Sequence, residues 1–378
     1  MIIKNSFLIF FFLFCFQINA QEKKSEFTIE GYVKYLPSYL DYNNNSNSEI
    51  NHLIHNRINL KGYFKEHFSI GFELRNRMIY GDNIIISNDA GIIDLSNFFI
   101  DKPKFKLHSM IDRFWFKYQK NKIEISIGRQ RVNWGINTIW NSNDLFNAYN
   151  FIDFDYVERP GSDVIRFIYN WDNLSSFEFV YKPNLDNLGV MAALYKINKI
   201  GYDFQFFGAN YYDQDFALGG GWAGNIRNAG FKGEVSYFLT KNPIPNENSF
   251  SLSTSFDYSF KNGIYILGSY LFNSNGLSNS NIFNLGAITE NVLSPKNLMP
   301  SKNSYIIQTS KPISPAINSS LTFLYGQGIN FLYISPNISY DINSDFDMNF
   351  IGQLFYANVN GNFKSLMNGI YLQLRYSF

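Results

Sequence analysis

The sequence predicts an all-β fold, a transmembrane antiparallel β-barrel, on two patterns. Residues 250–260, FSLSTSFDYSF, alternate large apolar side chains with small polar ones, and residues 370–378 repeat the alternation. Period-two segments of about ten residues are typical of strands that face lipid on one side and a polar lumen on the other. Only a closed ring of such strands leaves no unpaired backbone groups within a bilayer. We therefore expect the chain to be an integral protein of the cell outer membrane.

The first residues predict a secretory signal peptide. Lys4 precedes an apolar run from Phe7 to Phe16, which is too short for a spanning helix, and Ala20 closes the segment. We assign residues 1–20 to the signal peptide and residues 21–378 to the barrel. Cys15, the only cysteine, lies in this segment, so disulfides, cysteine-ligated zinc and cysteine catalysis are not expected in the exported chain.

The composition excludes some classes of protein. The whole chain has 32 basic and 31 acidic residues, so its net charge gives no reason to expect a nucleic-acid partner. Aromatic residues make up 19% of the chain, which argues against disorder. A folded protein with many amphipathic strands is the expected outcome.

The same alternation, followed along the whole chain, predicts about eighteen strands, with an expected range of sixteen to eighteen. We expect them to start near residues 27, 54, 68, 110, 122, 162, 174, 188, 200, 215, 228, 249, 263, 303, 316, 330, 345 and 366. The connections alternate in length. Short ones are expected at 65–67, 119–121, 170–173, 261–263 and 341–345, and long ones at 40–53, 81–109, 132–161, 239–248, 273–302 and 357–365. Bacterial barrels have short periplasmic turns and longer external loops, so the long connections are placed outside the cell.

The polar faces of the early strands predict a charged lumen. The expected pore-lining residues are Arg57, Arg75, Arg77, Arg113, Lys117 and Arg166. The tight turns place Arg113 and Arg166 opposite Gly128, with Arg77 level with Arg113. Lys117 and Glu124 belong to a set of alternating charges that can pair across strands.

The arginines, in contrast, lack enough acidic partners at their own level, so they predict a basic constriction that favours anions. The alternative is that acidic residues of an infolded loop neutralise them. The loop 132–161 carries Asp144, Asp153, Asp155 and Glu158 for that purpose.

The segment GRQRVNWG, residues 128–135, is expected at the external rim of the barrel. Its candidate residues are Gly128, Arg129, Arg131, Trp134 and Gly135. Arg129 and Arg131 share the parity of lipid-facing isoleucines, which would be costly near the midplane. Either a bulge at Gly128 turns them into the lumen, which we favour, or they meet lipid headgroups with Trp134 in the aromatic girdle.

This segment, with the loop rich in Asn, Asp and aromatic residues and the ERPG that follow, resembles Gram-negative outer-membrane porins. Over residues 128–163 the similarity is to barrels of the alginate-export type, and it implies eighteen strands with a basic lumen. The chain departs from that type in its nearly neutral charge and in its sparser positive lining after Arg166. The final strand, ending in Phe378, resembles the signal that such barrels present to the barrel-insertion machinery.

Enzymatic and metal sites are not expected. There is no G-x-S-x-G motif, and all four histidines, His52, His55, His67 and His108, fall in or near predicted connections, so none is placed to serve as a base. His52 and His55 alone are a weak metal signal. A barrel-borne hydrolase is kept as a minor alternative, and no cofactor is expected.

The function that these observations favour is passive diffusion of small anionic or carboxylated solutes through a basic constriction. The alternative is a plugged barrel that binds a glycan or a partner or assists assembly. Expected partners are outer-membrane lipid, a small anionic solute or saccharide, and the insertion machinery, with the chain as a monomer or a homotrimer.

Overall fold

The computed structural model describes residues 25–43, 48–82, 84, 86, 89, 91–147, 155, 158, 161–186, 188–241, 248–278, 294–359 and 361–378. The predicted signal peptide and Asp153 lie outside the described residues. The secondary-structure elements among the described residues are all β-strands: β1 (Glu26–Tyr42), β2 (Ser48–Phe64), β3 (Phe68–Gly81), β4 (Ser96–Lys102), β5 (Phe105–Lys120), β6 (Ile123–Gln130), β7 (Ser162–Asn170), β8 (Ser176–Lys182), β9 (Val190–Lys199), β10 (Tyr202–Tyr211), β11 (Asp215–Ile226), β12 (Ala229–Thr240), β13 (Ser249–Ser259), β14 (Tyr265–Asn273), β15 (Asn303–Ser314), β16 (Ile317–Gln327), β17 (Phe331–Asp341), β18 (Phe346–Val359) and β19 (Asn362–Ser377).

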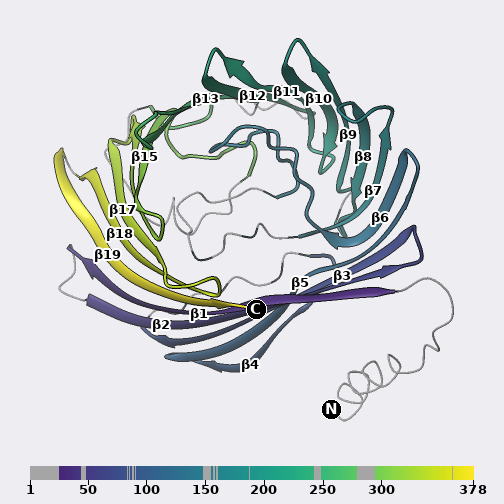
Figure 1. Ribbon diagram of the computed structural model, residues 1–378. Helices are drawn as coiled ribbons and strands as arrows, with labels where there is room; N and C mark the ends of the chain where they lie inside the picture. Colours follow the sequence, from purple (N-terminus) through teal and green to yellow (C-terminus); the bar gives the residue numbers. More distant parts are fainter. Residues whose placement is uncertain are drawn as a thin grey trace.

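Eighteen of the described strands close into one antiparallel ring, as predicted (Figure 1). Each strand pairs with the next along the chain, except that β3 pairs with β5, and β19 pairs with β1 to close the ring. The extra strand, β4, pairs only with β5, at residues 105–110. Because β6 pairs with β5 only at residues 114–120, β4 continues the sheet where β6 has ended.

The two faces of the wall differ as the alternation predicts. On β13, Phe256 and Tyr258 are exposed on the outer face, whereas Ser251, Ser253 and Ser255 are almost completely buried on the inner face. The apolar outer face is the surface that a bilayer covers. No helix among the described residues is long and apolar enough to cross a membrane.

Residues 131–147, which follow β6, fold into the barrel, and Figure 1 shows this segment inside the ring of strands. Its first part packs on the inner faces of β7 to β12, in a cluster that includes Val132, Trp134, Leu145 and Phe146. Ile139 and Trp140 join a second cluster, with Leu298 and Met299 and the inner faces of β14 to β19. Residues 132–147 therefore form an inner lining over much of the wall.

Several strands are longer than predicted. The connection expected at 40–53 is mostly strand, since β1 and β2 pair as far as Asp41 and Ser48, and β18 and β19 similarly shorten the loop expected at 357–365. An antiparallel pair continues its ladder of hydrogen bonds for as long as the two strands stay opposite each other. The sequence did not show this because Asn-rich and His-containing segments read as loops.

Candidate functional site: a charged wall facing an infolded loop

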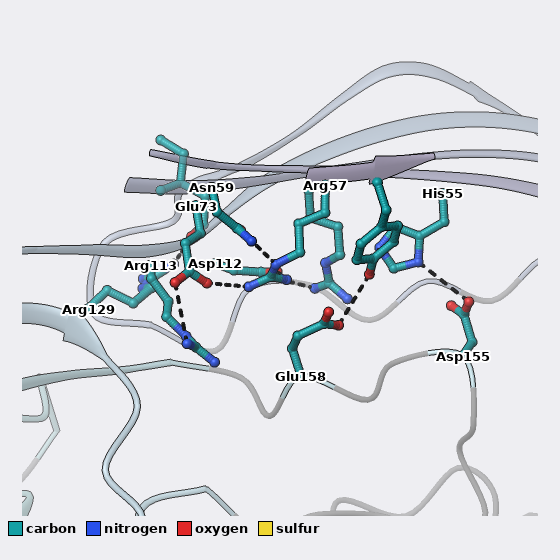
Figure 2. Close-up of polar contacts among 12 residues, drawn as sticks. His55, Arg57, Asn59, Glu73, Asp112, Arg113, Arg129, Asp155 and Glu158 are labelled. Carbon is teal, nitrogen blue, oxygen red and sulfur yellow. Dashed lines mark hydrogen bonds and ion pairs between the residues drawn. The ribbon is translucent and has the colours of Figure 1, made fainter. Parts of the chain in front are cut away.

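The inner face of β2, β3 and β5 carries a network of charges centred on Arg57 (Figure 2). Arg57 is almost completely buried, and its two terminal nitrogens each lie 2.5 Å from a carboxylate oxygen, one of Glu73 and one of Asp112. Its Nε donates to Asn59 at 3.1 Å. Arg75 adds a 3.0 Å ion pair to Asp112, and Arg113 adds a 3.4 Å ion pair to Glu73.

Asp112 enters this network through a bulge. Arg113 is paired with Glu73 and Ile111 with Leu74, so Asp112 is an extra residue on β5. A bulge places two residues opposite one and changes which face a side chain occupies. Strict alternation from Arg113 would have turned Asp112 toward lipid. The prediction that the arginines lack acidic partners at their own level is therefore wrong.

The cross-strand register also differs from the prediction. Gly128 lies opposite Trp115 and Val164, not opposite Arg113 and Arg166, and Arg77 is level with His108. The turns set the register of Gly128, because Lys120 pairs with Ile123 and Ile123 with Tyr169, and both ladders are regular from there. The bulge adds an offset only for residues 105–111 of β5, which include His108. The pairing of Lys117 with Glu124 is present, at 3.2 Å.

The predicted lining residues differ in how much of each faces the lumen. Arg57 and Arg75 are buried, and Arg77 is half-buried. The side chains of Arg113, Lys117 and Arg166 are 17%, 30% and 20% exposed. Arg166 holds both oxygens of Glu178, at 2.7 and 2.9 Å. These three cations therefore keep more exposed surface than Arg57 and Arg75 do.

The bulge that we favoured at Gly128 is absent, because β6 pairs regularly with β5 and β7 as far as Arg129 and Gln130. Gly128 instead has a φ of 112°, a backbone conformation that favours glycine. Arg129 stays on the outer face, where it pairs with Asp163 at 2.8 Å and Asp89 at 2.6 Å. It meets neither lumen nor headgroups, because Asp89 and residues 91–95 cover it: its Nη2 donates to the carbonyl of Ile93.

The remaining residues of the GRQRVNWG segment lie beyond the end of β6. Arg131 is exposed there. Trp134 is fully buried inside the barrel, and its indole donates to Glu178 at 2.8 Å, so it is not part of an aromatic girdle. Gly135 packs against the side chain of Asn141, where a Cβ would lie 2.6 Å from that of Asn141.

One buried carboxylate, on Glu234 of β12, holds the turn of the infolded loop. It accepts backbone N–H groups from Ile136 at 2.5 Å, Asn137 at 2.7 Å and Asn143 at 2.9 Å. Ser253 adds a hydrogen bond to the carbonyl of Trp140 at 2.9 Å. Sequence reasoning missed Glu234, because a single glutamate on a lumen-facing strand position carries no signal of its partner.

The far part of the loop reaches the opposite side of the wall. Lys34 lies 2.6 Å from Asp155, and His55 Nδ1 lies 3.4 Å from the same oxygen. Tyr32 donates to Glu158 at 3.2 Å. Burial acts to raise the pKa of Asp155, but the hydrogen bond from His55 and the charge of Lys34 outweigh it and hold the pKa below its usual range. Figure 2 shows Asp155 and Glu158 beside the charged wall.

The histidines correct a second expectation, since His52, His55 and His108 lie within strands and not in connections. His55 is fully buried on the inner face, whereas His52 bonds to the hydroxyl of Tyr35 on the outer face, so the two do not form a metal-binding pair. Within the described part of the chain no three His, Cys, Asp or Glu side chains are grouped to hold a metal ion.

The closed ring, the apolar outer face and the loop folded into a charged lumen define a membrane-spanning β-barrel of the outer-membrane type. Solved structures share it. OccAB3 of Acinetobacter baumannii matches with a TM-score of 0.61 at 12% identity, over 93% of this chain and 99% of that one. OccAB4 of the same organism matches with 0.59 at 11%, over 95% and 99%. The outer membrane protein OprD of Pseudomonas aeruginosa matches with 0.58 at 9%, over 93% of each.

At these identities the similarity establishes the fold. No protein-family model and no curated protein sequence matches the chain. The local resemblance to alginate-export barrels stays a prediction.

Proposed function

We propose that this protein is an outer-membrane channel through which small anionic or carboxylated solutes diffuse passively. The observation that carries the proposal is the infolded loop, which narrows an eighteen-stranded barrel from the β7–β13 side and contacts β1 and β2 through Asp155 and Glu158. The fold shared with the outer membrane protein OprD supports it. The passage then runs beside the charged wall.

Partly exposed cations would provide the anion preference. Arg113, Lys117 and Arg166 keep exposed surface while each lies beside one glutamate. A carboxylate that displaces water here gains charge-assisted hydrogen bonds, and paired cations hold it less tightly than an isolated guanidinium would. A channel needs such weak binding, because a solute must leave as readily as it enters. We expect a modest preference for anions.

Planar-bilayer recording tests the proposal. In a KCl gradient the reversal potential should indicate anion preference, and Arg113→Gln with Lys117→Gln should shift it toward cations, because the lumen then loses two positive charges and Glu124 loses its ion pair with Lys117. The matched control is Lys104→Gln with Lys261→Gln, which removes the same charge from exposed connections. An unchanged reversal potential in the lumen variant would contradict the proposal.

A plugged barrel that binds a partner is the second candidate, and the two apolar clusters inside the ring favour it. Their side chains fill the space between residues 132–147 and the inner face of the wall. Correctly folded protein that carries no current would support this candidate over the channel.

A further inference from the structure

We propose that a hollow in the outer face of β8 to β11 binds one acyl chain of a phosphorylated lipid of the external leaflet, with Lys241 beside its headgroup. The proposal is independent of the channel function, because it concerns the lipid-facing side of the wall and not the lumen. The four strands are consecutive in the ring (Figure 1). The hollow between their outer side chains has a volume of about 490 Å³.

Two small residues form the floor of the hollow. Ala193 and Gly208 are register partners on β9 and β10, and a Cβ built on Gly208 would meet only Leu218 Cδ2, at 3.5 Å. The same register row continues to Phe179 on β8 and to Leu218 on β11. Phe179 and Leu218 are 37% and 63% exposed on the outer face, so they stand on either side of the floor. The outer surface is therefore lower by one side chain here than on its two flanks.

The position of the hollow along the strands makes hydrocarbon its occupant. Gly208 lies three residues before Tyr211, where β10 ends, so it is about 10 Å along the strand from that end. This end is on the side of the barrel that carries the long connections, which we assign to the cell exterior. A bilayer covers the apolar outer face at this level. Water finds too few polar partners on such a surface, and an empty hollow forfeits packing contacts, so an acyl chain is the chemistry that fills it.

A polar cluster lies at the external rim of the hollow. Asn210, two residues beyond Gly208 on the same face, accepts a hydrogen bond from Lys241 Nζ at 3.0 Å. Asp213 accepts a second hydrogen bond from this ammonium group, which lies 4.6 Å from the centroid of the Phe216 ring. Within the part of the chain that the structure describes, these acceptors use two of its three N–H groups, so one is left for a headgroup. The Lys241 side chain is 23% exposed, so the protein does not enclose the cation.

The two contacts together select the lipid. Apolar burial in the hollow holds any acyl chain, whereas Lys241 favours a headgroup with a phosphate, because charge-assisted hydrogen bonds are the stronger kind. Asp213 competes for the same ammonium group, so the headgroup adds less to the affinity than the chain does. Lipid A, which carries acyl chains and two phosphates, is therefore the probe, and its dephosphorylated form is the reference.

Native mass spectrometry of the folded protein in detergent, titrated with lipid A, tests the hollow. Gly208→Leu fills the floor and should weaken binding at the tightest site about tenfold, the loss expected if the new side chain displaces two buried methylene groups. Gly268→Leu is the matched control, because Gly268 lies on the outer face of β14, opposite Phe256, and a Cβ there has open space around it. The heat-dependent gel mobility of folded barrels verifies that both variants fold.

Two charge variants test the headgroup contact. Lys241→Gln should weaken the binding of lipid A by about two- to fivefold, the range for a partly exposed ion pair, and leave binding of the dephosphorylated form unchanged. Asp213→Asn should strengthen the binding of lipid A, because it removes the competing carboxylate. The control is Lys302→Gln, since Lys302 also lies over an aromatic ring, with its Nζ 5.9 Å from the centroid of Phe272.

The outcomes distinguish this site from other ways of covering the wall. Equal binding by Gly208→Leu and Gly268→Leu would mean that lipid surrounds the barrel without a specific site, which overturns the proposal. If Lys241→Gln weakens both forms of lipid A equally, the phosphate is not recognised and the assignment of the headgroup fails. If Gly208→Leu changes the fraction of dimers or trimers and not lipid binding, a second copy of the chain occupies the hollow and the lipid is excluded.

Discussion

At the scale of single residues, carboxylates decide where the infolded loop lies. Glu234 gathers three loop amides on one side of the lumen, and Asp155 is gathered by Lys34 and His55 on the other. The two contacts have opposite charge arrangements. The wall provides the anion, Glu234, in the first, and the cation, Lys34, in the second. The loop is therefore held at both ends by charge-assisted hydrogen bonds.

Replacing Glu234 should release the turn of the loop. Glu234→Gln keeps the size of the side chain but removes the charge and one acceptor, so the docked loop should lose about 3 kcal/mol. We expect hydrogen exchange at the amides of Ile136, Asn137 and Asn143 to accelerate, with noisier channel currents.

The control for this prediction is Glu124→Gln, because Glu124 bonds to Lys117 and to no loop amide that we describe. Equal exchange rates in wild type and Glu234→Gln would show that packing of the apolar clusters, and not the carboxylate, positions the turn.

The anchor at Asp155 should resist mild acid. A carboxyl whose pKa is depressed in the folded state contributes stability above its unfolded pKa, and this is lost only as the pH falls through the lower folded value. Between pH 7 and pH 5 we expect open-channel noise to stay constant, whereas Asp155→Asn should raise it at both values. Noise that rises on acidification in wild type but not in Asp155→Asn would mean that Asp155 titrates within this range.

At the scale of elements, β4 and the segment before it show how an outer-face arginine is accommodated. Arg129 lies directly opposite Asp163 on β7, and residues 91–95 cover the pair together with Asp89, through the carboxylate of Asp89 and the carbonyl of Ile93. The amides of Ile92 and Leu95 complete the bonds to Asp163 and Asp89. A charge that alternation assigns to lipid is thus enclosed by another segment of the same chain.

Arg129→Ala should detach this segment. Removing one partner of a buried ion pair leaves the others uncompensated, at a cost of about 3 to 5 kcal/mol. Hydrogen exchange at Ile92 and Leu95 should accelerate, whereas Arg227→Ala, which changes an exposed turn residue, should leave it unchanged. Protected amides in Arg129→Ala would show that β4 alone holds the segment.

At the scale of the whole molecule, the closed ring depends on the pairing of β1 with β19. Ser38 and Tyr371 are register partners there. Gly31 and Phe378 exchange two backbone hydrogen bonds, and hydrogen-bonded and non-hydrogen-bonded pairs alternate along an antiparallel ladder. Counting from Gly31, Ser38 and Tyr371 form a non-hydrogen-bonded pair, in which the two Cα atoms lie closer together. Ser38→Cys with Tyr371→Cys should therefore oxidise to a disulfide in the folded protein.

Mass spectrometry of the peptides would detect the bond, and Cys15 is the only native cysteine that could compete. Ser38→Cys with Ser319→Cys is the control, because Ser319 belongs to β16, which pairs with β15 and β17. Failure of the first pair to oxidise in folded protein would contradict the closed ring.

Much of this architecture could be predicted from the sequence, because it depends on neighbours along the chain. Whether a side chain faces lipid or lumen follows from its parity within a strand, and short turns such as 65–67 and 261–263 lie between alternating segments. The fold class and the number of strands in the ring were therefore predicted correctly. So was the pairing of Lys117 with Glu124, which lie close to one tight turn.

The tertiary structure alone decided the chemistry of the lumen. The bulge that turns Asp112 inward, the folding of residues 132–147 against Glu234, and the covering of Arg129 all depend on residues far apart in the sequence. Alternation along one strand cannot show which distant group compensates a charge. The sequence by itself determined a barrel with a charged inner face, because partition between lipid and water acts on each residue locally; which charges are paired, and where the passage runs, was decided only when strands and loop came together.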